Sequence, residues 1–449
     1  MYMLKKMISA ALAVLLCATS LLNATGCTAT NAGKSAQDSK TTQTSANDGK
    51  KTTVEFWYAG GKTAVGVIQD IVDKYNKSQD KYEVKTVTQA DYDETYQKLQ
   101  AAIAGNSAPD LVLLSPSAAR TLDEKNLLAD LNEYTKKDDT FNKDDLISAF
   151  YSQGTNDKGG QFALPAYGTT QVLYYNIKAF EDAGVDPSSI KTWQDLGDAA
   201  KKIKATGKYE YGWEPMWGPD NMIDAALSNG ASVFSKDGKK VTINSKQWVE
   251  VFEQFRKWIH DDKTMAIHSG GQGWEYWYDT IDDVIQNKAG GYTGSSGDQA
   301  DLDFNIVQAI EQPAWSSATE SKPTAGAQTM SILKSSSDAE KQGAYDFLRY
   351  FMSVDSQVEW STTVGYVPVN KKIMEDDTYK KYLEDHPQAV VPFNQAKHAS
   401  IYPVDPTNGQ VHDALKVAAD KVEIDNVPAK EALDEAQKTA QAALDAVNK

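Results

Sequence analysis

Cysteine is almost absent from this chain of 449 residues, which contains only Cys17 and Cys27. Cys17 lies in an N-terminal apolar segment that ends shortly before Cys27, so the rest of the chain has no cysteine for a disulfide or a metal site. The histidines include no pair at the spacing of a zinc-binding helix, and we expect them at the surface; they stand at positions 260, 268, 386, 398 and 412. The sequence therefore predicts no metal and no cofactor, and a fold stabilised by packing.

Long apolar runs and positive charge are also scarce. No stretch after residue 22 reaches the roughly 18 apolar residues that a membrane-spanning helix needs. The chain has 46 basic and 62 acidic residues, and without Lys5, Lys6 and the charges of 28–53 it keeps 40 basic and 60 acidic residues, a net charge of about −20. Because such a body repels phosphate backbones and anionic membrane surfaces, nucleic acid is not an expected partner.

The N-terminus has the three parts of a secretory signal. Lys5 and Lys6 precede an uncharged, mostly apolar run over 7–22, and small residues stand directly before Cys27. This segment resembles the lipobox of bacterial lipoproteins, in which the cysteine is diacylated and becomes the new N-terminus, although Ala24 stands where that family prefers Leu. The resemblance implies lipidation of Cys27.

Residues 1–27 are therefore expected to be a lipoprotein signal peptide with its lipidated cysteine. Residues 28–53 are rich in Ser, Thr, Asn, Lys and Gly and predict a disordered tether. Two acyl chains give a durable anchor. The expected location is the outer side of the cell membrane, and the alternative is ordinary cleavage nearby and free secretion.

The folded body is expected to begin at Val54. Strand character alternates with helical spacing of apolar residues: strands are predicted over 54–58, 82–87, 110–114 and 172–175, and helices over 65–75, 92–103 and 432–447. Strands that alternate with helices predict an α/β layered protein. The length and the 41% hydrophobic content suggest two or three domains.

Several motifs carry a resemblance to a known family. They include Leu164-Pro165, Leu173-Tyr174-Tyr175-Asn176, the segment Lys191 to Leu196, and Gly365-Tyr366-Val367-Pro368. Together these motifs resemble the extracellular solute-binding proteins of ABC importers, and most of all their glycerol-3-phosphate-binding branch. The resemblance implies an α/β, type II periplasmic-binding-protein-like fold, with two α/β lobes joined by hinge strands around a ligand cleft.

The resemblance also implies the lobe limits and the partners. Lobe 1 is expected over 54–167 plus about 327–366, and lobe 2 over 168–326 plus about 367–449. The crossings should fall near 166–169, 323–326 and 366–370. The expected partners are a small-molecule solute and the permease subunits of the importer in the membrane, and the expected state is a monomer.

Ligands of open α/β sheets sit beyond the carboxyl ends of strands, where loops and helix N-termini present donors. Ser115 and Ser117 follow the third predicted strand and either bond the solute or cap the next helix. The other candidates match solute-contacting positions of the resembled branch: Tyr92, Gly168, Thr169, Ser295, Ser296, Gly326 and Tyr366. For each of them a core, turn or hinge role without ligand contact is the alternative.

Aromatic residues gather on two glycine-rich segments, a pattern typical of a sugar-binding cleft. Large rings offer flat apolar faces to the C–H faces of sugars and need few rotamers to be fixed on binding. We therefore single out Trp213, Trp217, Trp274 and Trp277 as solute contacts, with packing in the core as the alternative. Trp193, Trp248 and Trp258 lie in helical patterns and are assigned to the core.

The residues expected to bind the solute differ from those of the glycerol-3-phosphate-binding branch. Pro116 stands where the glycerol-3-phosphate binders carry an acidic residue, and their late arginine is missing, since no Arg follows Arg349. The planar fork of Arg is the usual bidentate partner of phosphate. We therefore expect a neutral carbohydrate, while glycerol-3-phosphate or a glycerophosphodiester, held by a backbone nest or a Lys, is the alternative.

No motif requires an enzyme. Gly60-Gly61-Lys62-Thr63 resembles the end of a phosphate-binding loop but lacks its first Gly, because Phe56 stands there. Carboxylate pairs such as Asp282-Asp283 are more typical of a solvated face than of a glycosidase. An extracellular glycosidase and a surface adhesin remain as alternatives of another class.

Overall fold

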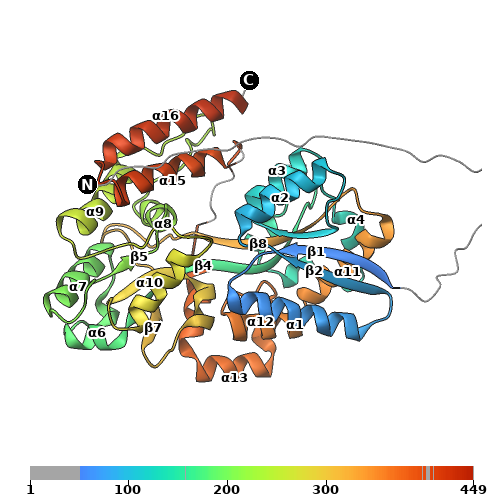
Figure 1. Ribbon diagram of the computed structural model, residues 1–449, viewed down its shortest axis with the longest axis horizontal. Coiled ribbons are helices and arrows are strands. Elements are labelled where there is room, and N and C mark those ends of the chain that lie inside the picture. Colours follow the sequence, from blue (N-terminus) through green and yellow to red (C-terminus); the bar gives the residue numbers. More distant parts are fainter. Residues whose placement is uncertain (1–50, 157, 397, 401–404, 408, 448–449) are drawn as a thin grey trace, which may run out of the picture. The chain divides into compact units, whose positions relative to one another are not determined.

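The computed structural model describes residues 51–449 apart from 157, 397, 401–404, 408 and 448–449 (Figure 1). The chain divides into two units, Met1–Gly49 and Lys50–Lys449, and only the second is described here. The predictions of a signal peptide, of a lipid on Cys27 and of most of the tether lie outside the described residues.

The strands of the described part join in one sheet of eight strands, in the order β2-β1-β3-β8-β4-β6-β5, with β7 pairing β4. They are β1 (Thr52–Tyr58), β2 (Tyr82–Thr88), β3 (Leu111–Leu114), β4 (Leu164–Asn176), β5 (Glu214–Pro215), β6 (Gly291–Ser295), β7 (Val307–Ile310) and β8 (Ala325–Ile332). β1 begins two residues before the expected Val54, because Thr52 and Thr53 already pair with β2.

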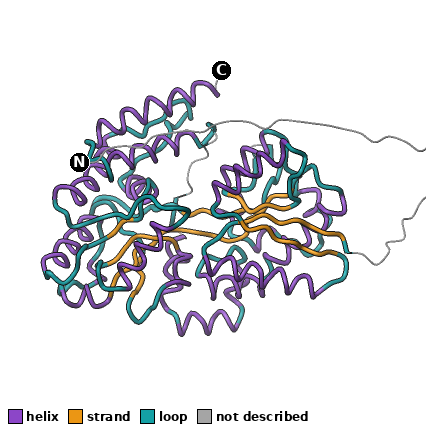
Figure 2. Tube along the Cα trace, viewed as in Figure 1, coloured by secondary structure: helices purple, strands orange, loops and turns teal. Residues whose placement is uncertain are grey.

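Helices lie on both sides of these strands (Figure 2). They are α1 (Lys62–Ser78), α2 (Tyr92–Ala104), α3 (Pro116–Glu124), α4 (Asn132–Thr135), α5 (Ser148–Ser152), α6 (Ile177–Asp182), α7 (Trp193–Ala205), α8 (Asp220–Ser228), α9 (Lys246–Arg256), α10 (Glu275–Ile285), α11 (Asp338–Phe351), α12 (Val354–Val364), α13 (Asp377–Asp385), α14 (Val390–Ala396), α15 (Gln410–Glu423) and α16 (Ala429–Val447). The predicted strands and helices are confirmed in type and position.

Helix starts follow local sequence signals. Thr192 accepts a hydrogen bond from the backbone of Asp195, whose side chain in turn accepts from the Thr192 backbone, and this capping box starts α7. In α1 the residues Ile68, Ile71, Val72 and Tyr75 are buried and lie on one face. The amphipathic pattern thus fixes which face of the helix packs on the sheet.

Buried apolar residues separate into clusters that define two lobes. Phe56, Leu113 and Phe347 belong to a cluster built by β1–β3, β8, α1, α11 and α12, which we call the first lobe. Trp193 and Trp248 belong to a larger cluster built by α6–α9, α15 and α16, which with β5–β7 and α10 forms the second lobe. Trp193, Trp248 and Trp258 are 0%, 0% and 4% exposed, which confirms their assignment to the core.

The segments expected to cross between the lobes lie side by side. β4 pairs β8 over Leu164–Thr170 and β6 over Gln171–Tyr175, so this one strand runs through both lobes (Figure 1). Gly168 exchanges two backbone hydrogen bonds with Val367, at 2.7 and 3.0 Å, and Thr169 pairs with Gly326. The carbonyl of Val369 accepts from the backbone of Ile147 in the first lobe. The lobe limits themselves remain a prediction.

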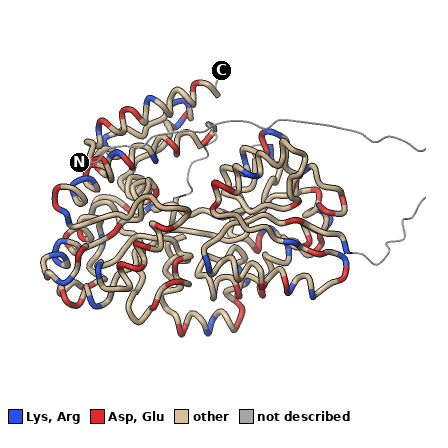
Figure 3. Tube along the Cα trace, viewed as in Figure 1, with Lys and Arg blue, Asp and Glu red and all other residues tan. Residues whose placement is uncertain are grey.

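Charged residues of both signs are scattered along the outer helices (Figure 3). No helix within the described ranges is long and apolar enough to cross a membrane.

Candidate solute-binding cleft

A cavity of about 640 Å³ lies where the loop after β1 and the loop before α2 face the start of α10. Its walls are therefore supplied by both lobes, and one wall is the carboxyl end of a parallel strand, where α/β proteins place their ligands. The lining residues are Gly60, Lys62, Val65, Ala90, Gln272, Trp274, Glu275, Tyr278 and Asp279.

The two walls touch each other at the edge of this cavity. The Lys62 backbone N–H donates to the Tyr278 hydroxyl at 3.2 Å, and the Lys62 ammonium lies 4.3 Å from the centre of the Tyr278 ring. The Thr63 hydroxyl donates to Asp301 at 3.2 Å. These contacts join the start of α1 in the first lobe to the second lobe.

A group of stacked tyrosines lies beside the crossing strands. The hydroxyls of Tyr92 and Tyr167 hydrogen-bond to each other at 2.9 Å, and the Tyr167 ring stacks on Tyr366 with 4.5 Å between ring centres. The Tyr92 ring in turn meets Trp274 edge to face at 5.7 Å across the lobes. Burial raises the pKa of the three tyrosine hydroxyls, so at neutral pH they keep their protons and act as hydrogen-bond donors.

Further hydroxyls lie next to this tyrosine group. The Oγ atoms of Thr169 and Ser295 are 3.4 Å apart, which joins β4 to the end of β6. Ser295 also accepts from the backbone of Gly297 at 3.1 Å and so caps the short helix η4 (Ser296–Asp301). The position of Gly297 is closed to larger residues, because a Cβ there would lie 2.3 Å from the Tyr366 ring. Hydroxyls and aromatic rings therefore meet at the crossing of the two lobes.

A buried carboxyl group fixes one of the aromatic residues. Asp298 accepts from Trp277 Nε1 at 2.9 Å and from the Tyr292 hydroxyl at 3.2 Å. It is 6% exposed, and this burial raises its pKa to about 8 despite both hydrogen bonds. Asp298 is therefore protonated at neutral pH, and it holds the indole of Trp277 without adding a charge to the second lobe.

The four tryptophans singled out from the sequence separate into two kinds. Trp274, Trp277 and Trp217 keep exposed surface, and Trp217 donates to Asp420 at 2.8 Å. Trp213 is instead a core residue of the second lobe: it is 0% exposed and donates to the Thr293 hydroxyl at 3.0 Å. The expectation that Trp213 touches the solute is corrected by this burial.

The remaining candidates differ in their burial and in their hydrogen-bond partners. Ser115 caps α3 by accepting from Ala118 at 3.4 Å, as its alternative interpretation predicted, and Ser117 is exposed. Ser296 is 0% exposed and Gly168 is buried, with the Phe150 ring filling the space where a side chain would start, so the structure corrects both as solute contacts. The structure brings together Tyr92, Thr169, Trp274, Ser295, Gly326 and Tyr366 around the crossing.

Three residues of this region were not singled out from the sequence. Tyr167 is the centre of the tyrosine group, and its signal was its place directly before Gly168 in an expected crossing. Lys62 and Tyr278 line the cavity. Gly60-Gly61-Lys62 resembles the end of a phosphate-binding loop, but two glycines after a strand also indicate close approach to a ligand.

The arginines of the chain are engaged away from the cavity. Arg120 donates to the Thr155 carbonyl, Arg256 pairs with Glu253, and Arg349 pairs with Asp138. Lys62 is the cationic side chain among the residues that line the cavity. The cavity thus lacks the bidentate partner that usually holds a phosphate.

Residues 70–387 match the family described as bacterial extracellular solute-binding protein. The chain belongs to this family. The match covers well over half of the chain and includes the crossing strands and α10, whereas Gly60, Lys62 and Val65 of the cavity wall lie just before its first residue. The solute-binding protein therefore acts outside the cytoplasm, and its family binds solutes.

Two relatives of this solute-binding protein share one name. A sn-glycerol-3-phosphate-binding periplasmic protein of Rhizobium meliloti is 23% identical over 414 residues, which cover 88% of this chain and 94% of the relative. A protein of the same name from Brucella abortus is 24% identical over 415 residues, with 88% and 93% covered.

Solved structures share the fold. The GacH receptor of Streptomyces glaucescens, whose structures include a complex with acarbose, has a TM-score of 0.78 at 18% identity, with 88% of this chain and 99% of the receptor covered. UgpB of Mycobacterium tuberculosis in complex with glycerophosphocholine also has a TM-score of 0.78 at 18% identity, with 89% and 100% covered. These likenesses confirm the expected type II periplasmic-binding-protein-like fold.

Proposed function

We propose that this solute-binding protein captures a neutral carbohydrate, a sugar or an oligosaccharide, outside the membrane and delivers it to the permease of an ABC importer. The observation that carries the proposal is the make-up of the cleft: Tyr92 and Trp274 meet across the lobes, hydroxyls surround them, and no Arg stands among the lining residues. Aromatic faces with neutral donors suit a sugar ring.

Capture takes place by lobe closure. The hinge is formed by β4 and β8, which pair at Thr169 and Gly326, where a Cβ on Gly326 would find open space apart from Gln153 at 3.7 Å. A solute that contacts both walls stabilises the closed arrangement, and it does so only by the difference between its affinities for the closed and open forms. The hydroxyls of the tyrosine group supply donors from the first lobe, and Trp274 supplies a flat face from the second.

A lipid on Cys27 would keep the carrier at the membrane. The sequence before Cys27 supports this part of the proposal, and residues 28–51 would form the tether between the lipid and β1.

Glycerol-3-phosphate or a glycerophosphodiester is the second candidate, because relatives at 23–24% identity carry the first of these names. In this chain its phosphate would depend on Lys62 and on the N-terminus of α1, whose first backbone N–H already donates to Tyr278. An extracellular glycosidase or adhesin is a candidate of another class. A glycosidase would release product with time, which a binding protein does not do.

The proposal is tested by a thermal-shift series on the tag-free chain 28–449 with neutral oligosaccharides, glycerol-3-phosphate and glycerophosphocholine. Bound solute stabilises the folded form by mass action, by about 2.7 kcal/mol at a hundredfold excess over Kd. A neutral oligosaccharide should raise the melting temperature, and its incubation mixture should contain no product. A shift with the phosphate compounds alone would refute the carbohydrate assignment.

Two variants locate the binding site. Trp274→Ala should reduce the shift to roughly half at the same solute concentration, because it removes the indole from the cavity wall and weakens binding about tenfold. Trp57→Ala is the matched control, since Trp57 is also partly exposed but does not line the cavity. An equal loss of binding in both variants would place the site elsewhere.

A further inference from the structure

Glu214 is a buried acidic residue without a hydrogen-bond partner. It lies on β5 in the second lobe and is 0% exposed, and neither of its carboxyl oxygens has a hydrogen-bond partner among the described residues. A buried carboxyl group normally has such partners, because leaving water without them is costly. A buried acid that lacks partners therefore requires an explanation, and a site for a bound ion is one of the usual ones.

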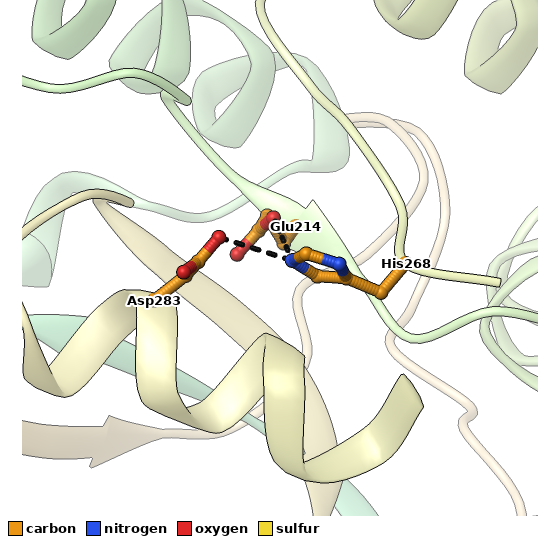
Figure 4. A group of neighbouring side chains, drawn as sticks. All are labelled: Glu214, His268 and Asp283. Atoms are coloured by element: carbon orange, nitrogen blue, oxygen red, sulfur yellow. Dashed lines mark hydrogen bonds and ion pairs between the residues drawn. The ribbon is translucent and has the colours of Figure 1, made fainter. Parts of the chain in front are cut away.

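His268 and Asp283 supply two more donor atoms around the same point (Figure 4). One nitrogen of the imidazole faces both carboxyl groups, with Nε2 3.0 Å from Asp283 Oδ2 and 3.6 Å from Glu214 Oε1. One donor atom from each of the three residues lies within 4.8 Å of the other two. The residues come from a strand, a loop and α10, so the fold itself brings them together.

The surroundings fit a bound cation. Lys288 holds the other oxygen of Asp283 at 2.8 Å and so orients that carboxyl group. Asp283 is 7% exposed, whereas the His268 side chain is 32% exposed, which leaves an entry path from solvent on the imidazole side. The second lobe thus brings together the buried carboxyl group of Glu214, the oriented carboxylate of Asp283 and the accessible imidazole of His268.

We propose that Glu214, His268 and Asp283 bind a divalent transition-metal ion, with Zn²⁺ as the best match. Zinc accepts imidazole nitrogen and carboxylate oxygen at about 2.0–2.2 Å in tetrahedral geometry, which places neighbouring donor atoms roughly 3.3–3.5 Å apart. The distances of 3.0 Å from Nε2 to Asp283 and 3.6 Å from Nε2 to Glu214 lie on either side of this range. A single imidazole with two carboxylates is less suited to Ca²⁺ and Mg²⁺, which prefer oxygen ligands only.

The ion would hold together three residues that come from β5, from the loop before α10 and from α10 itself. It would also fasten the exposed glycine-rich segment 269–273 between His268 and Trp274. α10 begins directly after this segment, and Asp283 lies on the same helix. The metal would therefore fix the loop that presents Trp274 to the cavity, although its own binding does not depend on the identity of the solute.

The test uses the tag-free chain 28–449 after dialysis against a chelator, titrated with Zn²⁺ in a calorimeter and with Co²⁺ by visible absorption. Wild type should bind one ion per chain, with the intense visible bands of tetrahedral Co²⁺. Glu214→Gln and His268→Gln should each lower the affinity by at least about tenfold, since each removes one ligand. His398→Gln is the matched control, because His398 faces a single carboxylate, Glu311, at 2.6 Å.

Melting temperatures distinguish a variant that has lost a metal ligand from one that no longer folds properly. Zn²⁺ at a hundredfold excess over Kd should raise the melting temperature of wild type and of His398→Gln by about 3–5 °C. Without metal, Glu214→Gln should melt no lower than wild type, because it replaces a buried acid by a neutral group of the same shape, and Zn²⁺ should not shift it. Failure of wild type to bind one ion at micromolar concentrations, or equal binding by Glu214→Gln and wild type, would overturn the site.

Discussion

Asp298→Asn should reduce the dependence of the protein's stability on pH. Asp298 is 6% exposed and receives hydrogen bonds from Trp277 and Tyr292, and burial raises its pKa to about 8. An aspartate in an unfolded chain ionises near pH 4, at about 3.9. Between these two values the folded protein holds a proton that the unfolded chain has released.

The direction and the size of the pH effect on the free energy of unfolding follow from this difference in pKa. Because the folded state binds more protons, the free energy of unfolding falls as the pH rises from about 4 to about 8, and below pH 4 the carboxyl has no effect. Each pH unit in this window costs up to about 1.36 kcal/mol, so near pH 7 the loss amounts to roughly 4 kcal/mol. Asn matches the shape of the protonated acid and carries no charge, so the variant escapes this loss.

The measurement is urea unfolding of wild type and Asp298→Asn at pH 4.5, 6.0 and 7.5. At pH 4.5 the two should differ by no more than about 1 kcal/mol, because Asn can still accept from Trp277 while the Tyr292 hydroxyl turns to accept from the new amide. At pH 7.5 the variant should be more stable by several kcal/mol. Asp279→Asn, at an exposed carboxylate on the same wall, serves as the control. A difference that stays constant from pH 4.5 to 7.5 would refute the argument.

Three more predictions follow from the packing and from the N-terminus. In urea unfolding, Trp213→Ala should lower the free energy of unfolding by about 3–5 kcal/mol, because its ring is wholly buried. Trp274→Ala should change the free energy of unfolding by less than about 1 kcal/mol but should weaken solute binding by about tenfold. Similar losses of stability in the two variants would contradict the distinction between a core and a cleft tryptophan. Gly168→Ala should cost about 1–3 kcal/mol, since its Cβ would lie 2.3 Å from the Phe150 ring, and the same change should cost less in a chain that already carries Phe150→Ala. Cys27→Ser should move the protein from the detergent-extracted membrane fraction to the medium, and retention in the membrane would argue against the lipid.

The secondary structure was predictable because each element carries a local signal. The apolar run Leu111–Leu114 became a strand that is buried along its whole length, and α1 followed the spacing of its buried residues. The start of β1 was missed by two residues, since Thr52 and Thr53 are polar and their strand conformation depends on pairing with β2, which is distant in sequence.

The candidate site was only partly predictable, because exposure depends on partners far along the chain. Trp213 and Trp274 both follow a glycine, so their local sequences look alike. Trp213 forms a bridge to Met265 and donates to Thr293, which draw it into the core, whereas Trp274 meets Tyr92 from the other lobe. None of these partners lies within the same segment, so periodicity and composition cannot separate the two tryptophans.

The same limit applies to the histidines. A search for pairs at helical spacing treats His268 as an isolated surface residue, and the structure shows it partly exposed. Glu214 and Asp283 approach it only because β5, the loop before α10 and α10 itself fold onto one another. A group that combines one residue from each of three elements leaves no spacing pattern in the sequence.

The pairing of β3 with β8 also constrains how the chain folds. Leu111 pairs with Ile332, which stands 221 positions later, the difference between their numbers. During synthesis, the first-lobe sheet therefore keeps an open edge at β3 until β5–β7 and α6–α10 of the second lobe have emerged. Pairing over such a separation is slow, and an unpaired edge is prone to associate with other chains. The first lobe therefore cannot complete its sheet before β8 has been synthesised.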